Sequence, residues 1–380
     1  MTTNSHGRVA YYPADLAIVI ADLGAGGAQR VATNLAAGLA SRGWSVSLIT
    51  LAADVPDHFT LPPAVHRIGL DLAQRASGVL AAIAANIGRV VALRRAIRVS
   101  AAPVVLSLVG TTNVLSVLAC SGLGIRLVIS ERNDPSRQSL GRAWDWLRRR
   151  LYRRADTVTA NSAAAIAALA TYVPNSKLVQ VPNPLIVPDM DPEPELPLRS
   201  HRILCVGRLS HQKAQDILLP AFARALPSAP DWRLALVGTG DREAGLRALA
   251  SKLGIGAQID WIGATPDIWH EYRNSDVLAL PSRHEGMPNV VLEAMAFGVP
   301  VIVSDAAGGA LDYVVDGTSG LIVRNSDVDS LTSAMVCMMT APALRSRLGS
   351  AGRERVRSLL PDTAFGTWER VLGLTQLDLL

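Results

Sequence analysis

The sequence has little cysteine and few charged residues. Its 3 cysteines, Cys120, Cys205 and Cys337, are scattered along 380 residues without paired spacing. This pattern argues against a disulfide framework and a cysteine-based zinc site, and it predicts a reducing, cytoplasmic compartment. Charged residues make up 18% of the chain and hydrophobic residues 49%, so the sequence can bury large cores and is not a disordered chain.

The sequence also offers no clear membrane span or secretory signal. Residues 103–125 carry no charge and are long enough to cross a bilayer. However, the Gly-Thr-Thr-Asn stretch at 110–113 interrupts the apolar run, which therefore predicts a strand, a loop and a helix in a soluble core. Residues 1–15 are polar and lack the apolar segment of a signal peptide.

Metal-binding and hydrolase motifs are missing too. The histidines do not fall at metal-ligand spacing, and no GxSxG elbow occurs. Asp189 and Asp191 form an acidic pair of a kind that can bind a divalent cation, but prolines flank it on both sides. We therefore assign this pair to a linker and predict neither a metal nor a cofactor.

What the sequence does contain is a regular alternation of short apolar runs with longer helical patterns. This alternation is typical of parallel sheets with helices on both faces, and it predicts an α/β fold. Strands are expected near 16–21, 45–51, 104–108, 127–130, 157–160, 178–181, 203–206, 233–237, 258–262, 277–280, 301–304 and 320–323. Expected helices include 28–42, 163–172, 214–225, 243–253 and 288–297.

A proline-rich segment divides the chain. Residues 182–197 hold six prolines in sixteen residues, which excludes both a helix and a central strand. We expect two doubly wound domains, 1–183 and 199–360, joined by a linker at 184–198. A final helix within 361–380 can pack back on the first domain. Ligands of such sheets bind beyond the carboxyl ends of the strands, so a site is expected in a cleft between the domains.

The most specific motif lies in residues 281–300 and reads Ser-x-x-Glu-Gly-x-Pro-x-x-x-x-Glu. A helix is expected to begin at Pro288, and free N–H groups at a helix start attract phosphate. Glu285 can accept hydrogen bonds from sugar hydroxyls, and Glu293 can reach a ribose. The alternative is that Glu285 caps the helix and Glu293 is a solvated surface charge. The residues expected to bind phosphate are Gly286, Met287, Pro288, Asn289 and Val290.

A second motif, Gly207-Arg-Leu-Ser-His-Gln-Lys213, follows a predicted strand directly. Its arginine and lysine put two cations beside the expected cleft, where Arg208 can bind a diphosphate through two hydrogen bonds and Lys213 supplies a point charge. The alternative is that both residues are ordinary surface charges.

Two glycine loops also follow predicted strands. The first spans 22–30 and contains Gly24, Gly26 and Gly27, which allow the backbone to approach a ligand closely. Its spacing is not that of a dinucleotide-binding fingerprint. The second spans 236–243 and contains Gly238.

Together these segments resemble the signature of the family 4 glycosyltransferases, and the resemblance covers nearly the whole chain. It implies retaining enzymes of the GT-B fold, with two Rossmann-like domains facing across a cleft. In such enzymes the first domain, 1–183 here, would bind the acceptor, and the second, 199–360, would bind the nucleotide sugar. It further implies that Arg208 and Lys213 bind the donor diphosphate and stabilise the leaving group, that the first glycine loop borders phosphate and acceptor, and that Gly238 lies near the nucleotide.

The chain departs from the family at residues 131–133. Many members carry a histidine close to the reacting sugar, whereas this sequence has Glu131, Arg132 and Asn133. The Ser-Glu-Arg-Asn-Asp-Pro form resembles a bacterial subgroup that builds polysaccharides and glycan repeat units. Glu131 is the candidate to touch the transferring sugar; alternatively, Glu131 and Arg132 pair with each other or with nearby charges. The predicted catalytic residues are Arg208, Lys213, Glu285 and Glu131, and the predicted substrate-binding residues are Gly26, Gly27, Gly207, Gly238, Gly286, Met287, Pro288, Asn289, Val290 and Glu293.

The small excess of basic residues, 37 against 32 acidic ones, is concentrated in two segments. Residues 88–98 hold four arginines and no acid, and residues 141–154 hold six arginines against Asp145. In the second segment the apolar residues Trp144, Leu147, Leu151 and Tyr152 lie between the arginines. This pattern is typical of a helix at an anionic membrane surface. The alternative is a solvated helix whose aromatic residues face the core; no nucleic-acid-binding module accompanies the patch, so nucleic acid is not expected.

The resemblance therefore implies a specific reaction. A hexose or N-acetylhexosamine would pass from a nucleotide sugar, expected to be a UDP-sugar, to a saccharide on a polyprenyl diphosphate, with retention, an alpha linkage and no metal. The enzyme would work at the inner face of the plasma membrane. Two alternatives stay open: a non-catalytic scaffold that binds a nucleotide sugar, and another GT-B enzyme such as a nucleotide-sugar epimerase, for which no acid–base set is found.

Overall fold

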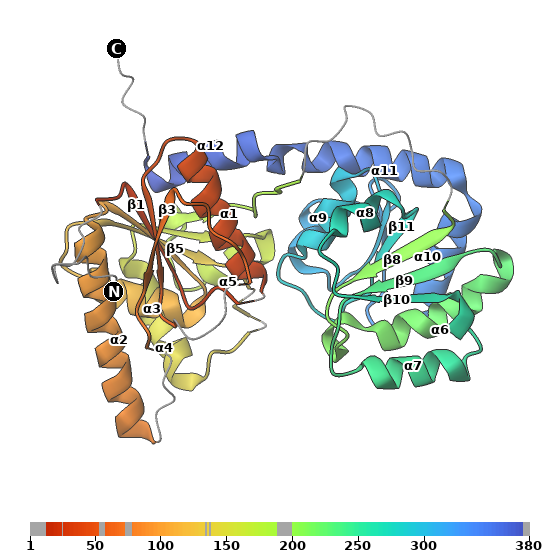
Figure 1. Ribbon diagram of the computed structural model, residues 1–380, viewed down its shortest axis with the longest axis horizontal. Helices are drawn as coiled ribbons and strands as arrows, with labels where there is room; N and C mark the ends of the chain where they lie inside the picture. The colour runs from red at the N-terminus through yellow and green to blue at the C-terminus, as the bar shows by residue number, and fades with distance from the viewer. Residues whose placement is uncertain are drawn as a thin grey trace, which may run out of the picture. The chain divides into compact units, whose positions relative to one another are not determined.

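The computed structural model describes residues 13–24, 26–52, 58–72, 78–133, 135–136, 138–187 and 200–374. The chain forms two compact units: unit 1 comprises residues 1–184 and 361–380, and unit 2 comprises residues 185–360 (Figure 1). The acidic pair at 189 and 191 and most of the predicted linker lie outside the described residues.

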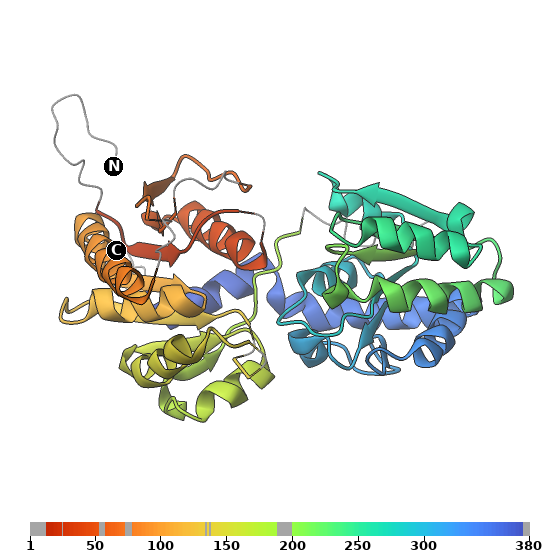
Figure 2. The same cartoon turned by 90° about the horizontal axis from the view of Figure 1, so that it is seen from below.

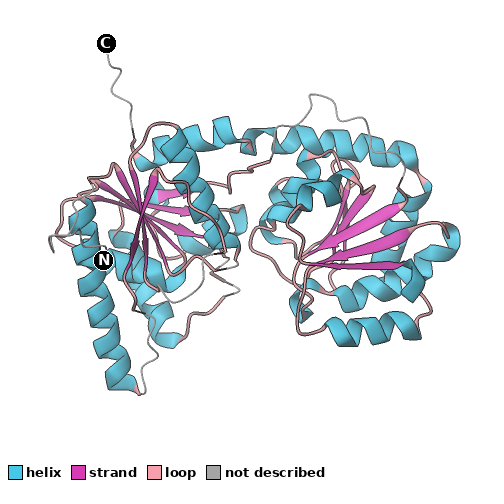
Figure 3. Ribbon diagram, in the orientation of Figure 1, coloured by secondary structure: helices cyan, strands magenta, loops and turns pink. Residues whose placement is uncertain are grey.

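Unit 1 is built on a seven-stranded parallel sheet in the order β3-β2-β1-β4-β5-β6-β7. Figure 3 draws strands in magenta and helices in cyan. Its strands are β1 (Leu16–Ile20), β2 (Val46–Thr50), β3 (Val65–Gly69), β4 (Val104–Leu108), β5 (Arg126–Glu131), β6 (Thr157–Ala160) and β7 (Leu178–Gln180). Its helices are α1 (Gly27–Ser41), α2 (Val79–Ser100), α3 (Gly110–Cys120), α4 (Arg142–Leu151), α5 (Ala163–Ala170) and α12 (Pro361–Leu372), with 3₁₀ turns at Tyr152–Arg154 and Asn175–Lys177.

Every residue of β1, β2 and β4 is buried, as expected for inner strands of a parallel sheet that is covered on both faces. Helix α2 packs along α3, and α3 packs along α4 (Figure 2). The uncharged stretch 103–125 therefore forms β4 and α3. The loop predicted at 110–113 is wrong, because α3 begins at Gly110; Asn113 is accommodated in its first turn by donating Nδ2–H to the carbonyl of Ser130 (3.0 Å).

The last described helix, α12, docks on α1 within unit 1. Glu369 accepts hydrogen bonds from Arg42 Nε (2.8 Å) and Trp44 Nε1 (2.9 Å). Phe365 lies directly over Gly38, where a Cβ atom would come within 1.9 Å of the ring. Glycine at this position thus allows α12 to approach α1 closely.

Unit 2 is built on a six-stranded parallel sheet in the order β10-β9-β8-β11-β12-β13. Its strands are β8 (Arg202–Val206), β9 (Arg233–Val237), β10 (Ile259–Gly263), β11 (Val277–Leu280), β12 (Val301–Ser304) and β13 (Leu321–Val323). Its helices are α6 (Gln215–Ala225), α7 (Glu243–Lys252), α8 (Ile268–Arg273), α9 (Asn289–Ala296), α10 (Val328–Thr340) and α11 (Pro342–Val356). Short 3₁₀ turns lie at η3 (His211–Lys213), Leu226–Ser228, Gly256–Gln258, Gly308–Asp312 and Arg357–Leu359.

The α/β prediction is confirmed, and all the predicted strands are present. Strand β3 was not predicted, because its sequence Val-His-Arg-Ile-Gly is polar and mostly half-buried at the sheet edge. Helix α9 begins one residue later than expected, with Pro288 as its N-cap. No helix in the described part of the chain is long and apolar enough to cross a membrane.

Candidate functional site

Two loops meet at the carboxyl edge of the unit 2 sheet. One follows β8 and the other follows β11, and these strands are neighbours in the sheet. The amide of Arg283 donates to the carbonyl of Gln212 (2.8 Å), and Gln212 Nε2 donates to the carbonyl of His284 (3.0 Å). The loops are thus joined by hydrogen bonds running in both directions.

An ion pair at the same junction brings together two of the residues singled out in the sequence. Lys213 Nζ donates to Glu285 Oε1 at 2.7 Å, with 15% and 8% of the two side chains exposed. Gly207 makes room for the lysine, since a Cβ atom there would lie 2.9 Å from Lys213 Cε. Removing one partner would leave a largely buried charge unpaired, which is costly. Lys213 is therefore not an ordinary surface charge.

Arg208 lies beside this pair but differs from it. Its side chain is exposed and makes no hydrogen bond or ion pair with other described residues. Its carbonyl accepts a hydrogen bond from Gln215 Nε2 (3.0 Å), which fixes the backbone. Gly238 packs behind the loop, where a Cβ atom would come within 2.2 Å of the carbonyl oxygen of Gly207. Arg208 is thus an exposed cation on a well-fixed backbone.

The loop before α9 is held by backbone contacts. The amide of Glu285 donates to Ala306 O (3.1 Å), and the carbonyl of Gly286 accepts from Gly309 N (2.6 Å). Pro288 is the N-cap, and no side chain caps the helix, so the alternative in which Glu285 caps it is wrong. Within the first turn of α9, the amide of Val291 donates to the carbonyl of Pro288 (3.1 Å). Amides at a helix start have no carbonyl four residues earlier in the helix to bond. Next to them, Met287, Asn289 and Val290 are half-buried and Pro288 is buried.

Glu293 is buried rather than solvated, which overturns the surface-charge alternative. Only 2% of it is exposed, and its Oε2 accepts a hydrogen bond from Tyr272 Oη on α8 (2.8 Å). Tyr272 itself is fully buried. The role of Glu293 toward a ribose stays a prediction, and any such contact must involve a carboxylate already fixed by a tyrosine.

A second ion pair in unit 2 escaped the sequence analysis. Arg283 Nη1 and Nη2 donate to the two carboxylate oxygens of Asp216, each at 2.9 Å, and Nη1 also donates to the carbonyl of His211 (2.6 Å). Burial alone would raise the pKa of Asp216, but the hydrogen bonds and charge of Arg283 hold it below its ordinary value. The pair joins the start of α6 to the loop that carries Glu285. Arg283 belongs to the motif at residues 281–300, but no sequence spacing predicts Asp216 as its partner.

In unit 1, the glycine loop follows β1. Asp22 Oδ1 accepts hydrogen bonds from the amide of Gly24 (2.9 Å) and from Gln29 Nε2 (3.0 Å). Gly26 is the N-cap of α1, and Gly27 has open space where a Cβ atom would lie. The loop is therefore fixed by Asp22 and Gln29, which sequence reasoning did not single out, while Gly27 leaves room in front of it.

Glu131 lies in the interior of unit 1. Only 2% of it is exposed, and its carboxylate accepts a hydrogen bond from Tyr152 Oη. Asn113 Nδ2 donates to the same tyrosine oxygen (3.2 Å). Burial raises the pKa of Glu131, and burial with the neighbouring carboxylate raises that of Tyr152. The geometry therefore favours a structural role for Glu131 over the predicted sugar contact.

Arg132 contacts Asn183 and Trp368 rather than Glu131. It donates to Asn183 Oδ1 (2.8 Å) and lies 5.0 Å from the ring centre of Trp368 on α12. Burial lowers the pKa of Arg132 to about 9. The alternative in which Glu131 and Arg132 pair with each other is absent from the hydrogen bonds and ion pairs of the described residues.

The two basic helices differ in what they expose. On α4, Arg148 is 5% exposed and pairs with Asp145 (3.0 Å), and Leu151 packs into the core. The alternative of aromatic residues facing the core is thus correct for Trp144 and Tyr152. On α2, by contrast, a row of apolar residues is exposed: Leu80 (82%), Ile83 (53%), Ile87 (60%) and Val91 (62%).

Metal-ligating side chains do not gather in the described ranges. No group of three or more His, Cys, Asp or Glu residues there could hold a metal ion.

Comparisons with known proteins agree with this arrangement. Residues 26–184 match the family model "Glycosyl transferase 4-like domain", and residues 188–355 match "Glycosyl transferases group 1". An undecaprenol-linked saccharide alpha-1,4-N-acetyl-D-galactosaminyltransferase of Campylobacter jejuni is 27% identical over 90% of this chain and 93% of its own length. A GDP-mannose-dependent phosphatidylinositol monomannoside mannosyltransferase of Mycolicibacterium smegmatis is 31% identical over 54% of this chain and 58% of its own. The chain spans about half the length, or less, of several other curated relatives.

Solved structures share the fold at low sequence identity. Sucrose-phosphate synthase of Thermosynechococcus elongatus has a TM-score of 0.77 and 22% identity over 95% of this chain and 98% of its own. HepE of Anabaena, solved in complex with UDP and glucose, has a TM-score of 0.75 and 19% identity over 95% of this chain and 100% of its own. The two family models cover the greater part of both units. The chain therefore belongs to the family 4 glycosyltransferases and has the GT-B fold.

Proposed function

We propose that the chain transfers a hexose or N-acetylhexosamine from a UDP-sugar to a saccharide on a polyprenyl diphosphate, with retention of the anomeric configuration. The observation that carries this proposal is the Lys213–Glu285 pair, at 2.7 Å, between two joined loops of unit 2. Arg208 and the start of α9 flank it. Cations and a helix start at one sheet edge are suited to a diphosphate.

The Lys213–Glu285 ion pair would rearrange when the donor binds. The diphosphate takes Lys213 as a partner together with Arg208, and Glu285 is then released to accept a hydrogen bond from a sugar hydroxyl. Charge that develops on the departing diphosphate is stabilised by groups already in place. Because Lys213 and Glu285 exchange partners, each of them keeps a hydrogen-bonding partner at every stage.

Retention follows from the face of the sugar on which the acceptor attacks. The acceptor oxygen forms its bond to the anomeric carbon on the face from which the diphosphate leaves, and the hydroxyl proton passes to the departing phosphate oxygen. Glu131 takes no part in this step, because it is buried against Tyr152. The leaving group thus serves as the base, and no carboxylate nucleophile is needed.

The choice of donor and acceptor draws on relatives. HepE, which shares the fold, was solved with UDP, and the Campylobacter relative acts on an undecaprenol-linked saccharide. The mycobacterial relative instead uses GDP-mannose, so a GDP donor is the alternative outcome to test.

A lipid-linked acceptor requires contact with a membrane, and α2 offers a suitable face. The exposed row Leu80, Ile83, Ile87 and Val91 lies on one side of the helix at helical spacing, and the exposed Arg95 and Arg98 continue that side. Apolar side chains followed by cations fit the interface of an anionic bilayer. We therefore assign the membrane contact to this face of α2 rather than to α4.

A donor screen tests the proposed reaction. The full-length protein is incubated with UDP-glucose, UDP-galactose, their N-acetylhexosamine counterparts and GDP-mannose, with and without membrane extract, and free nucleotide is measured. UDP release that the extract accelerates is expected, and the product should carry an alpha linkage by NMR. Release of GDP would correct the donor. Binding of a nucleotide sugar without any release would favour the scaffold alternative.

A further inference from the structure

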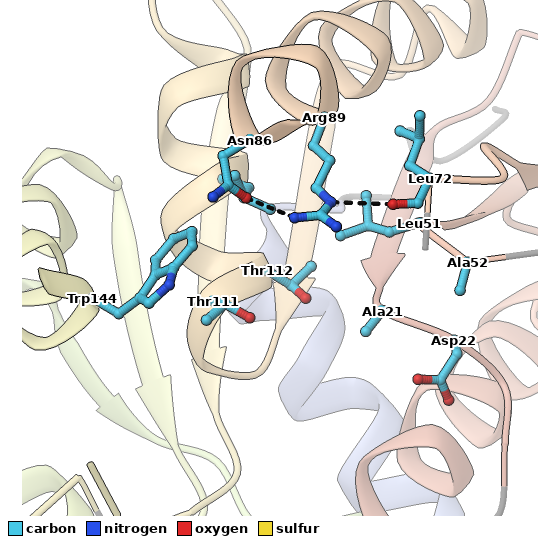
Figure 4. A pocket seen from close by; sticks show the side chains of 11 residues that line it. Ala21, Asp22, Leu51, Ala52, Leu72, Asn86, Arg89, Thr111, Thr112 and Trp144 are labelled. Carbon is cyan, nitrogen blue, oxygen red and sulfur yellow. Dashed lines mark hydrogen bonds between the residues drawn. The ribbon is translucent and has the colours of Figure 1, made fainter. Parts of the chain in front are cut away.

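A cavity of about 330 Å³ lies in unit 1, at the carboxyl ends of β1 and β2 (Figure 4). Helices α2, α3 and α4 contribute its other walls. Small and aliphatic side chains form much of the lining, and the polar or aromatic residues in it are Asp22, Asn86, Arg89, Thr111, Thr112 and Trp144. A cavity of this size suits one small-molecule unit rather than a chain of several.

The lining combines an aromatic wall with hydrogen-bonding groups. Trp144 is half-buried and reaches from α4 toward Thr111 and Asn86 (Figure 4). The threonines offer hydroxyls that both donate and accept, and Asp22 offers a carboxylate acceptor. A pyranose ring has a face of C–H groups that stacks on an indole and an edge of hydroxyls that needs such partners. The C–H face of a pyranose would thus contact the indole, and its hydroxyl edge would contact the hydrogen-bonding groups of the lining.

Charge in the cavity is balanced. Arg89 Nη1 donates to Asn86 Oδ1 (2.8 Å), and its Nε donates to the carbonyl of Leu72 (3.2 Å), so the guanidinium is fixed against the wall. Asp22 is fixed in turn by Gly24 and Gln29. One anion and one cation, each held by the protein, suit a neutral polar ligand. A diphosphate would need several cations and would be repelled by Asp22.

We propose that this cavity binds one pyranose ring of the acceptor saccharide, stacked on Trp144, with a ring hydroxyl donating to Asp22 and further hydroxyls bonded to Thr111. The proposal rests on the proposed glycosyl transfer and adds to it which residues select the acceptor sugar. The acceptor diphosphate is bound elsewhere, because the cavity lacks the charge for it.

Saturation-transfer NMR on the full-length protein tests the site directly. The probes are the methyl alpha-glycosides of galactose, glucose, mannose, N-acetylgalactosamine and N-acetylglucosamine. Trp144→Ala is compared with Trp146→Ala, a matched control on the same helix, since Trp146 is 59% exposed and does not line the cavity. Wild type and Trp146→Ala should saturate the ring protons of at least one glycoside, and Trp144→Ala should lose that signal.

Two further variants keep the test valid if Trp144→Ala unfolds, which a thermal melt would reveal. Asp22→Asn and Thr111→Val change hydrogen bonding without removing a large side chain, and each should weaken the signal of the preferred sugar. Equal signals in Trp144→Ala and Trp146→Ala, no signal with any glycoside in wild type, or full signal in both polar variants would overturn the proposal.

Acceptor kinetics separate this proposal from the glycosyl transfer on which it rests. Trp144→Ala should raise the acceptor KM by about tenfold, which corresponds to about 1.4 kcal/mol of lost binding. If transfer occurs but both tryptophan variants share the wild-type acceptor KM, the cavity assignment fails and the transferase stands. If no donor is turned over but sugar binding still depends on Trp144, the cavity stands and the proposed reaction fails.

Discussion

The carboxyl edges of the two sheets use charge in opposite ways. At the edge of unit 2, charged side chains form pairs of opposite charge: Lys213 with Glu285 across two loops, and Arg283 with Asp216 at the start of α6. At the edge of unit 1, the charged Glu131 is withdrawn into the interior, and the cavity nearby is neutral overall. The same architecture thus presents ion pairs in one unit and, in the other, a cavity whose one anion and one cation balance.

Solvation explains the difference. Burial raises the pKa of Glu131 and lowers that of Arg132 to about 9, because a buried environment disfavours the charged form of each group. Lys213 and Glu285 keep some exposure and an opposite charge at contact distance. A charged donor therefore suits unit 2, and a neutral sugar suits unit 1.

The largest effect is expected from removing Lys213, the cation that the proposed function assigns to the donor diphosphate. Lys213→Ala should lower turnover by about 10²–10³-fold, because it deletes charge stabilisation of the leaving diphosphate. Lys252→Ala, an exposed lysine at the end of α7, is the matched control. Nucleotide release measures the effect, and circular dichroism checks the fold. Equal turnover in the two variants would show that unit 2 does not hold the diphosphate through Lys213.

A second prediction concerns the face of α2, which belongs to the unit with the neutral pocket. Ile87→Ser should weaken binding to phosphatidylglycerol vesicles by about tenfold, since a side chain of this size contributes roughly 1.5–3 kcal/mol when buried in an apolar layer. Val315→Ser, at a 41% exposed position in unit 2, is the control. Vesicle sedimentation measures both. Sedimentation of Ile87→Ser at the wild-type level would place the membrane contact elsewhere.

The third prediction concerns the Arg283–Asp216 pair, which joins the loop carrying Glu285 to α6. Arg283→Ala should raise the donor KM a few-fold, because the loop carrying Glu285 loses its tie to α6. It should also remove the loss of stability that protonation of Asp216 causes at low pH. The folded-state pKa of Asp216 is depressed, so its stabilising effect is present above the unfolded pKa and is lost as pH falls through the folded value.

Kinetics and thermal melts from pH 3 to pH 7 measure the two effects, with Arg247→Ala on the exposed face of α7 as the control. An Arg283→Ala melt that falls at low pH as steeply as wild type would show that the pair does not govern Asp216.

Much of the fold was predictable, because buried parallel strands such as Val104–Leu108 are short apolar runs that a sequence displays directly. Strand β3 was missed because an edge strand needs little apolar content. The sequence also named Lys213 and Glu285, since both lie just after strands. It could not pair them, because contact across 72 residues depends on strand order, which no local pattern encodes.

The burial of the site residues could not be predicted from the sequence. Residue type indicates the chemistry of Glu131, Glu293 and Trp144, but their surroundings depend on which side of a strand or helix faces the interior. Glu131 and Glu293 are buried against tyrosines, and Trp144 lines a cavity instead of a membrane face. A tyrosine partner distant in sequence leaves no signal in spacing, so these assignments required coordinates.

The smallest expected effect tests whether Glu131 is a buried structural group. Its folded-state pKa lies above the unfolded value, so the folded state holds its proton longer and stability falls as pH rises from the unfolded pKa toward the folded one. Glu131→Gln cannot ionise and keeps an acceptor and a donor for its neighbours, so its stability should decline less over that window. Thermal melts from pH 4 to pH 8 measure this, with Glu354→Gln, whose side chain is 65% exposed in wild type, as the control. If the two variants change in parallel with pH, Glu131 ionises without cost, and it would again be a candidate for contact with the sugar in unit 1.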